Sequence, residues 1–215
     1  MTTHTPRLAP LSGKPASKLV ILLHGYGANG DDLIGLADAW QPMLPDAAFV
    51  SPDAPEPCEG AGFGYQWFPL PRIHPDELWP GVQRAAPGLQ AFIDEELARY
   101  GLEETDLALV GFSQGTMMAL HVGLRRSRAV AGILGYSGAL AGAEMLKSEI
   151  RSKPPVLLIH GTLDDLIPVQ AMPMAAAFLG ELGVPVDSLS CPGLGHGISP
   201  EGVAAGGRFL VETLR

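Results

Sequence analysis

A nucleophilic turn is indicated by the pentapeptide GFSQG at residues 111–115. A serine hydroxyl is a weak nucleophile unless the chain projects it into the site and a base contacts it. In G-x-S-x-G the serine occupies a strained turn between a strand and a helix, and the glycines leave room for those elements to approach. An apolar run, 107–110, precedes the pentapeptide and a helix-like stretch, 115–124, follows it. We therefore expect Ser113 to be a catalytic nucleophile.

An acid and a histidine follow later strands in the order that this kind of serine hydrolase requires. The segment HGTLDDLIP, residues 160–168, comes directly after an apolar run and contains two neighbouring carboxylates. Either Asp164 or Asp165 could orient a catalytic histidine, because adjacent side chains should point in different directions. The segment CPGLGHG, residues 191–197, follows a further apolar run. We expect His196, which has glycine on both sides, to be the general base.

An acyl-transfer site also needs N–H donors aimed at the oxyanion. One donor should be the backbone N–H of Gln114, which follows the nucleophile at the positive end of its helix. The second should come from the glycine-rich segment HGYGANG, residues 24–30, which follows the first long strand. We expect the backbone N–H of Tyr26 to supply it. His24 and His160 each follow a strand and precede glycine, and we expect both to fix their turns through hydrogen bonds.

Short apolar runs, glycine-bearing turns and helix-like segments alternate along the chain. We expect strands over residues 18–23, 47–50, 107–110, 130–134, 156–159 and 186–190. We expect helices over residues 31–44, 83–100 and 115–124, near Glu144, between Val169 and Leu182, and after Ser199. Apolar strands that alternate with helices predict an α/β fold with a mostly parallel sheet covered on both faces. Ligands bind such sheets beyond the carboxyl ends of the strands.

The segment from Pro52 to Pro80 breaks this alternation. It is rich in glycine and proline and carries the aromatic residues Phe63, Tyr65, Trp67, Phe68 and Trp79. A loop of that length in a compact domain is usually functional. We expect the aromatic part, residues 63–68, to flank the pocket for the acyl or alcohol group.

Length and charge restrict the classes of function. The 215 residues suit one domain, 1–215. The net charge of −9 argues against nucleic acid and against an anionic membrane surface. No apolar run approaches the roughly 20 residues of a membrane span, and no signal peptide is visible, so we expect a cytoplasmic protein without stable membrane insertion. Cys58 and Cys191 are expected to be free thiols, and no metal-binding motif is present.

Two other classes of function are compatible with parts of the sequence. Residues 25–30 also satisfy G-x-G-x-x-G, and Asp53 lies about where a ribose-binding acid of a dinucleotide-binding oxidoreductase would be. However, Asp31 and Asp32 would repel a pyrophosphate at the N-terminus of the helix that follows. A non-catalytic, hydrolase-like binding module is the other alternative. Such a module would not need to keep the nucleophile, the acid and the base together.

The motifs HGYGANGDD, GFSQG, HGTLDDLIP and GLGHG resemble those of the phospholipase/carboxylesterase family, which includes the acyl-protein thioesterases. The resemblance extends from about Leu19 to the C-terminus. It implies an α/β-hydrolase fold and hydrolysis of carboxylic esters or thioesters without a cofactor. It places the acid on Asp164 and the oxyanion donors on Tyr26 and Gln114. It also implies that Trp67 and Phe68 lie in a loop on the substrate side.

Two positions depart from the family's pattern. Tyr26 stands where leucine is usual, and Thr116 stands where glycine or alanine is common after the pentapeptide. The departures leave the predicted triad intact and leave the acyl-chain preference open. The family's substrates include small esters, lysophospholipids and S-acylated proteins, and we expect the partner to be a small ester or acyl substrate or an S-acylated protein. We expect a monomer or a homodimer.

Overall fold

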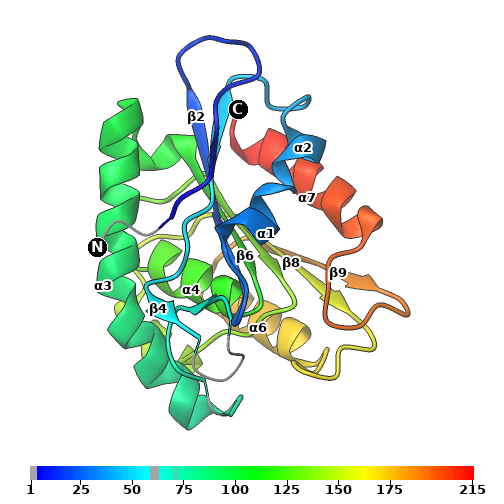
Figure 1. Cartoon of the computed structure of the whole chain (residues 1–215). Helices are drawn as coiled ribbons and strands as arrows, with labels where there is room; N and C mark the ends of the chain where they lie inside the picture. The colour runs from blue at the N-terminus through cyan, green and yellow to red at the C-terminus, as the bar shows by residue number, and fades with distance from the viewer. Residues whose placement is uncertain (1–3, 59–62, 71) are drawn as a thin grey trace.

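A seven-stranded sheet forms the centre of the computed structural model, which describes residues 4–58, 63–70 and 72–215 (Figure 1). The strand order is β1-β3-β2-β6-β7-β8-β9, and all neighbours are parallel except β1, which is antiparallel to β3. The strands are β1 (Arg7–Leu8), β2 (Lys18–Leu23), β3 (Ala47–Val50), β6 (Leu107–Phe112), β7 (Gly132–Tyr136), β8 (Val156–Gly161) and β9 (Val186–Cys191). The predicted α/β fold is confirmed, and each predicted strand is present within two residues of its expected ends. Among the strands of this sheet, β1 alone was not expected.

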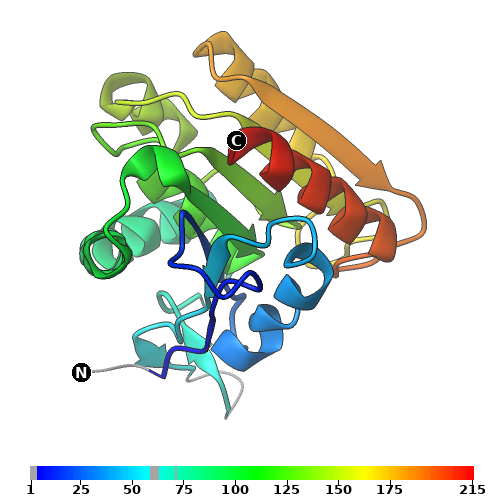
Figure 2. The ribbon, with the colours of Figure 1, turned by 90° about the horizontal axis from the view of Figure 1, so that it is seen from above.

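The apolar strands form the centre of the sheet because both of their faces are covered. In β2, Leu19, Ile21 and Leu23 belong to one hydrophobic core, while Val20 and Leu22 belong to a second core on the other face. The first core contains residues of α3 (Pro75–Tyr100), α4 (Gln114–Gly123), α5 (Ala143–Glu149) and α6 (Ala171–Glu181). The second contains residues of α1 (Gly30–Ile34), α2 (Ala37–Trp40) and α7 (Pro200–Thr213). Figures 1 and 2 show α2 and α7 on one side of the sheet and α3 on the other.

The long loop predicted over residues 52–80 is shorter in the structure. Its last part is helical, because α3 begins at Pro75 instead of residue 83. Proline suits the first helical position, His74 is the N-cap, and acidic residues follow in the first turn. The helix ends as expected at Gly101, which has the left-handed φ of 68°. The remaining loop contains β4 (Glu56–Pro57) and β5 (Tyr65–Gln66), which pair with each other.

The single helix predicted over residues 31–44 is two short helices, α1 and α2, separated at Gly35 and Leu36. A short 3-10 helix, η1 (Glu104–Asp106), precedes β6. None of the helices in the described part of the chain combines the length and the apolarity that a bilayer crossing requires.

Candidate active site

Ser113 occupies a strained turn between β6 and α4. Its φ of 54° and ψ of −115° lie where residues with a side chain are rarely found. The flanking glycines allow this geometry. A Cβ on Gly111 would overlap the backbone of Gly115 and Thr116, and a Cβ on Gly115 would overlap the carbonyl of Leu23. The turn is therefore built as the sequence predicts, with strand and helix in contact through glycine.

The carboxyl edge of the sheet brings the candidate residues to one place. Ser113 follows β6, Asp164 follows β8 and His196 follows β9. In the sheet, β6 and β8 are separated by β7, and β9 is the edge strand next to β8. Because the strands are parallel, the loops after them leave the sheet at the same edge.

Asp164 and His196 form a direct hydrogen bond. The Nδ1 atom of His196 lies 2.8 Å from Oδ2 of Asp164. The Asp164 side chain is completely buried, and that of His196 is 14% exposed. The neighbouring Asp165 is exposed. Of the two neighbouring carboxylates that the sequence offered as the acid, Asp164 is therefore the one that contacts the histidine.

The surroundings of Asp164 favour its charged form. Burial alone would raise the pKa of this carboxyl, but the hydrogen bond from His196 and the N–H groups of Ile167 and Leu166 hold the pKa below its ordinary value. These two N–H groups donate to Oδ1 over 2.9 and 3.0 Å. A carboxylate that stays charged can accept the Nδ1 proton of His196. That leaves Nε2 of the ring as a proton acceptor.

His160 also contacts Asp164, which sequence reasoning missed. Its Nε2 lies 2.8 Å from the carbonyl oxygen of Ile167 and 3.1 Å from Oδ2 of Asp164. Since a carbonyl only accepts, Nε2 carries the proton and points at both oxygens. The expected turn-fixing role of His160 is confirmed, and the same N–H reaches the carboxylate. The only signal for this contact in the sequence is that His160 and Asp164 are four residues apart.

The loops that carry Asp164 and His196 are attached to each other. The N–H of Leu163 donates to the carbonyl of Leu194 over 2.9 Å, and the N–H of Thr162 donates to the carbonyl of Cys191 over 3.0 Å. A Cβ on Gly161 would overlap the carbonyls of Leu194 and Gly195. These contacts fix the distance between the acid and the histidine through backbone atoms.

His196 also lies next to the nucleophile's strand. Its ring centroid is 5.0 Å from that of Phe112, the residue before Ser113. The Ser113 hydroxyl itself has no hydrogen-bond partner among the described residues. In enzymes without substrate the hydrogen bond between nucleophile and base is often long and tightens only in the complex. The observed contact is thus between the imidazole and the residue that precedes Ser113.

The expected oxyanion donors lie on the two segments beside Ser113. Gln114 is the first residue of α4, where a backbone N–H has no partner within the helix. The turn that contains Tyr26 passes close to the nucleophile, because a Cβ on Gly25 would lie 3.3 Å from Cβ of Ser113. His24 holds this turn. Its Nδ1 donates to the carbonyl of Gly25 over 2.7 Å, and its Nε2 accepts from the N–H of Ala54 over 2.9 Å.

Trp67 and Phe68 are held by the side chain of Gln114. The Oε1 atom of Gln114 accepts from the N–H of Trp67 over 2.9 Å, and Nε2 donates to the carbonyl of Phe68 over 2.8 Å. Trp67 is 5% exposed and borders a cavity of about 260 Å³ between residues 52–55 and α3. Phe68 is fully buried in the core. Their contact with a substrate stays a prediction, and Phe63, at 74% exposed, is the open member of this aromatic segment.

The segment that satisfies G-x-G-x-x-G binds its own carboxylates. Asn29 caps α1 and forms a reciprocal capping box with Asp32. The N–H of Gly30 donates to Oδ1 of Asp53 over 2.8 Å, so the acid that a dinucleotide would need for its ribose is buried against the turn. A pyrophosphate would meet negative charge here. Within the described residues, no group of three or more His, Cys, Asp or Glu side chains is arranged to hold a metal.

Comparison with known proteins gives one consistent result. The sequence profile of the phospholipase/carboxylesterase family matches residues 10–214. Acyl-protein thioesterase 1 of Gibberella zeae is 28% identical over 228 residues, which covers 97% of each chain. A probable carboxylesterase of Oryza sativa subsp. japonica is 30% identical, covering 85% of this chain and 82% of its own. The crystal structure of esterase PE8 is 44% identical over the whole of both chains, with a TM-score of 0.96.

Proposed function

The chain belongs to the phospholipase/carboxylesterase family of ester-hydrolysing enzymes, and from this we propose that Ser113, His196 and Asp164 are its catalytic triad. One observation carries the proposal. A fully buried aspartate accepts the Nδ1 proton of His196 over 2.8 Å, at the sheet edge where Ser113 stands in a strained turn. Neither a dinucleotide site nor a passive binding module requires that combination.

The proposed reaction begins with His196. Because its Nδ1 donates to Asp164, Nε2 is the free base that removes the Ser113 proton as the hydroxyl attacks the ester carbonyl. The backbone N–H groups of Gln114 and Tyr26 then stabilise the oxyanion. His196 passes its proton to the leaving alcohol or thiol. Water repeats the sequence on the acyl-enzyme and releases the acid, so that no cofactor is consumed.

The substrate class that fits best is a carboxylic ester or a thioester. The relatives are named acyl-protein thioesterase and probable carboxylesterase. Ester and thioester hydrolysis can both proceed through an acyl-enzyme. We propose that Trp67 and Phe68 form or support the wall next to the acyl group, held by Gln114. Lysophospholipids and S-acylated proteins remain within the same class.

The proposal also includes the compartment, the domain organisation and the oligomeric state of the enzyme. We place it in the cytoplasm, as one domain over residues 1–215 and as a monomer or homodimer. Cys58 and Cys191 are both buried and unpaired, which fits a reducing compartment. The hydroxyl of Ser199 donates to Sγ of Cys191 over 3.3 Å.

A fluorophosphonate probe tests the triad. We expect one covalent adduct on the wild type in an intact mass spectrum, and none on Ser113→Ala. Turnover of p-nitrophenyl butyrate should fall by several orders of magnitude in the same variant, because triad members act as a unit. Ser188→Ala removes an exposed serine on β9 and should keep both adduct and turnover. Activity of Ser113→Ala within about tenfold of the wild type would exclude the triad.

A further inference from the structure

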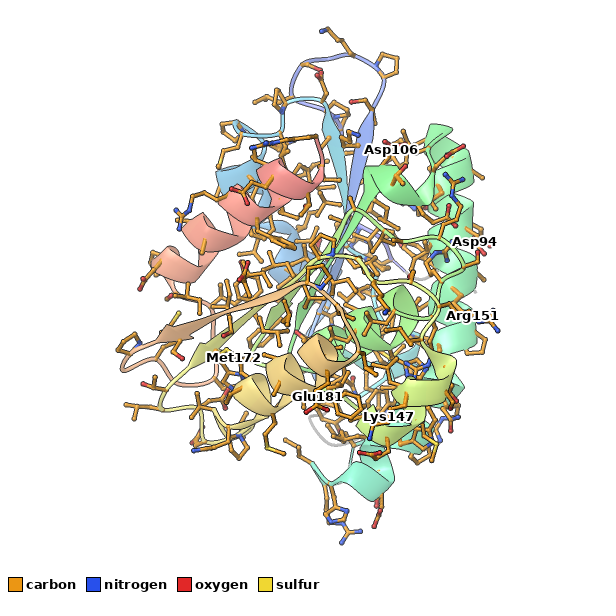
Figure 3. All side chains as sticks on the ribbon, turned by 180° about the vertical axis from the view of Figure 1, so that it is seen from behind. Asp94, Asp106, Lys147, Arg151, Met172 and Glu181 are labelled. Carbon is orange, nitrogen blue, oxygen red and sulfur yellow. The ribbon has the colours of Figure 1, made fainter. Side chains whose placement is uncertain are left out.

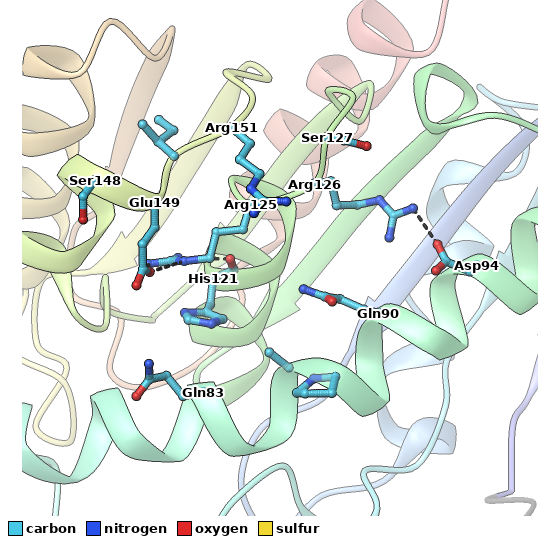
Figure 4. Close-up of a pocket in the computed structure, with 13 residues that line it drawn as sticks. Gln83, Gln90, Asp94, His121, Arg125, Arg126, Ser127, Ser148, Glu149 and Arg151 are labelled. Carbon is cyan, nitrogen blue, oxygen red and sulfur yellow. Dashed lines mark hydrogen bonds and ion pairs between the residues drawn. The ribbon is translucent and has the colours of Figure 1, made fainter.

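The two ends of α4 have different polar surroundings. The C-terminal end borders a cavity of about 690 Å³, where Arg125 pairs with Glu149 over 2.8 Å (Figure 4). In the same cavity Arg126 pairs with Asp94 over 2.6 Å, and Figure 3 shows Asp94 on the side of the molecule that α3 covers. These charges bind one another. At the N-terminal end, which follows Ser113, the polar contacts instead join two loops that are distant in the sequence.

The first contact between these loops is made by the backbone. The aromatic loop, residues 63–68, forms a short antiparallel bridge with the turn that contains Tyr26. The N–H of Tyr65 donates to the carbonyl of Ala28 over 2.8 Å, and the N–H of Gly27 donates to the carbonyl of Tyr65 over 2.9 Å. Gly64 permits this approach, because it has a left-handed φ of 72° and a Cβ there would overlap the carbonyl of Gly27.

The indole of Trp67 makes a second attachment to the same turn. Its Nε1–H donates to the carbonyl of His24 over 2.9 Å, and both residues are buried. That carbonyl also lies against the first turn of α4, since a Cβ on Gly115 would be 2.8 Å from its oxygen. A buried carbonyl that loses its donor finds no water to replace it. Trp67 therefore fixes the turn at the point where it meets the helix of the nucleophile.

Three consecutive peptide units of the turn are held in this way. The first joins His24 to Gly25, and its carbonyl accepts from Trp67. The second joins Gly25 to Tyr26, and its carbonyl accepts from Nδ1 of His24 over 2.7 Å. The third joins Tyr26 to Gly27, and its N–H donates to the aromatic loop. Because a trans peptide unit is planar, the carbonyl of Gly25 and the N–H of Tyr26 point in opposite directions within one rigid group, whose direction these bonds fix.

We propose that Trp67 is a positioning residue of the oxyanion hole. This inference rests on the proposed function, in which the backbone N–H groups of Tyr26 and Gln114 stabilise the oxyanion. Trp67 is attached to both donors, because its indole holds the turn before Tyr26 and its backbone N–H donates to the side chain of Gln114 over 2.9 Å. Donors that are already aimed at the developing charge need no reorganisation during the reaction. The indole N–H thus acts on the reaction through the backbone of His24.

Trp67→Phe removes the indole N–H and keeps an aromatic ring. We expect kcat for p-nitrophenyl butyrate to fall by about tenfold while KM stays within about twofold, because the oxyanion forms only in the transition state. The inhibition constant of a trifluoromethyl ketone should rise by a similar factor, since its adduct with the serine carries an oxyanion at the same place. The p-nitrophenyl esters of acetate and hexanoate should lose kcat equally, because the hole contacts the carbonyl and not the chain.

Trp40→Phe is the matched control. The indole N–H of Trp40 donates to the carbonyl of Val203 over 2.9 Å, and Trp40 is also buried, but this bond joins α2 to α7. Both variants lose the same kind of bond, so we expect both to be less stable in urea and only Trp67→Phe to lose kcat. Incorporation of 3-benzothienylalanine at position 67 is the second test. It replaces the N–H by sulfur and keeps both rings, and it should lower kcat even where phenylalanine destabilises the fold.

Two outcomes would overturn the inference. Equal kcat in Trp67→Phe and Trp40→Phe would show that the indole bond does not act on the reaction. A KM that rises with the length of the acyl chain, at unchanged kcat, would make Trp67 a wall of the acyl pocket only. Both outcomes keep the triad, because Ser113 would still form the fluorophosphonate adduct. A wild type without adduct and turnover would instead contradict the proposed function, and the inference with it.

Discussion

The side-chain amide of Gln114 donates to the backbone carbonyl of Phe68 over 2.8 Å, while the same amide accepts from the N–H of Trp67. Gln114 therefore has two functions in the proposed site. Its own backbone N–H lies beside the nucleophile, and its side chain fixes the aromatic loop that would contact substrate. The amide is fully buried, so water cannot replace either bond.

Replacing Gln114 by alanine should weaken both the fold and the site. The N–H of Trp67 and the carbonyl of Phe68 would lose their partners, at a cost of about 1–3 kcal/mol for each group. We expect the free energy of unfolding in urea to fall by about 3 kcal/mol, and turnover of p-nitrophenyl esters to fall with it. Gln170→Ala, at an exposed position before α6, should change neither quantity. An unchanged stability of Gln114→Ala would mean that the loop is held by other contacts.

Replacing each aspartate by asparagine tests which of Asp164 and Asp165 orients the histidine. In Asp164→Asn an N–H can face Nδ1 of His196, which favours the tautomer with the proton on Nε2, where the base is needed. We expect kcat to fall by about 10³- to 10⁴-fold while the fold is retained. Asp165→Asn changes an exposed carboxylate and should keep kcat within a factor of about two. Equal losses in the two variants would contradict the assignment of the acid.

The buried His121 should make the stability of the fold depend on pH. Burial and the charge of Arg125 lower the pKa of His121 to about 3, from 6.5 in an unperturbed side chain. Between these pH values the unfolded chain binds a proton that the folded chain does not. The stabilisation is therefore complete above about pH 6.5 and is lost as the pH falls toward 3, by at most about 1.4 kcal/mol per pH unit.

Urea unfolding at pH 7, 5.5 and 4.5 measures this slope. His121→Gln removes the titrating group, and we expect its stability to fall less steeply with acid than that of the wild type. His4→Gln changes an exposed histidine and should preserve the wild-type slope. A His121→Gln slope equal to the wild-type slope would show that the ring is protonated in the folded chain.

The fold and the order of the candidate residues could be predicted because they depend on local patterns. Continuous apolar runs marked the strands, and the strand ends located Ser113 and His196. The start of α3 could not be predicted, since Pro80 lies inside the helix and proline normally ends one. The residues alone did not decide between Asp164 and Asp165, and the expectation of Asp164 came from the family resemblance; in the structure, burial and the hydrogen bond to the histidine distinguish them.

Side-chain contacts between segments that are distant in the chain leave no recognisable pattern in the sequence. Thr116, a departure from the family's pattern, is buried with its hydroxyl 2.8 Å from the carbonyl of Gly111 and 2.9 Å from that of Tyr136. Its methyl group lies where a Cβ on Gly135 or Gly138 would be. The threonine therefore attaches α4 to the ends of β6 and β7. Only the three-dimensional structure shows this, because these partners lie up to 22 positions from Thr116 in the sequence.

Two glycines of α3 offer a matched pair of substitutions that tests the packing of Phe68. A Cβ on Gly81 would overlap the Phe68 ring, while a Cβ on Gly88 would meet no atom within 4 Å. Alanine is favoured over glycine in a helix by about 1 kcal/mol, so Gly88→Ala should stabilise the fold by about 0.5–1 kcal/mol. In Gly81→Ala the overlap costs about 1–3 kcal/mol and should outweigh this gain.

Urea midpoints of the two variants measure the difference, with turnover of p-nitrophenyl butyrate as the second readout. We expect Gly81→Ala to be less stable than the wild type and to lose turnover, because a displaced Phe68 shifts the carbonyl that Gln114 binds. Gly88→Ala should keep wild-type turnover. If Gly81→Ala were as stable and as active as Gly88→Ala, the Phe68 ring would not lie against α3, and the loop would have to be held by Gln114 alone.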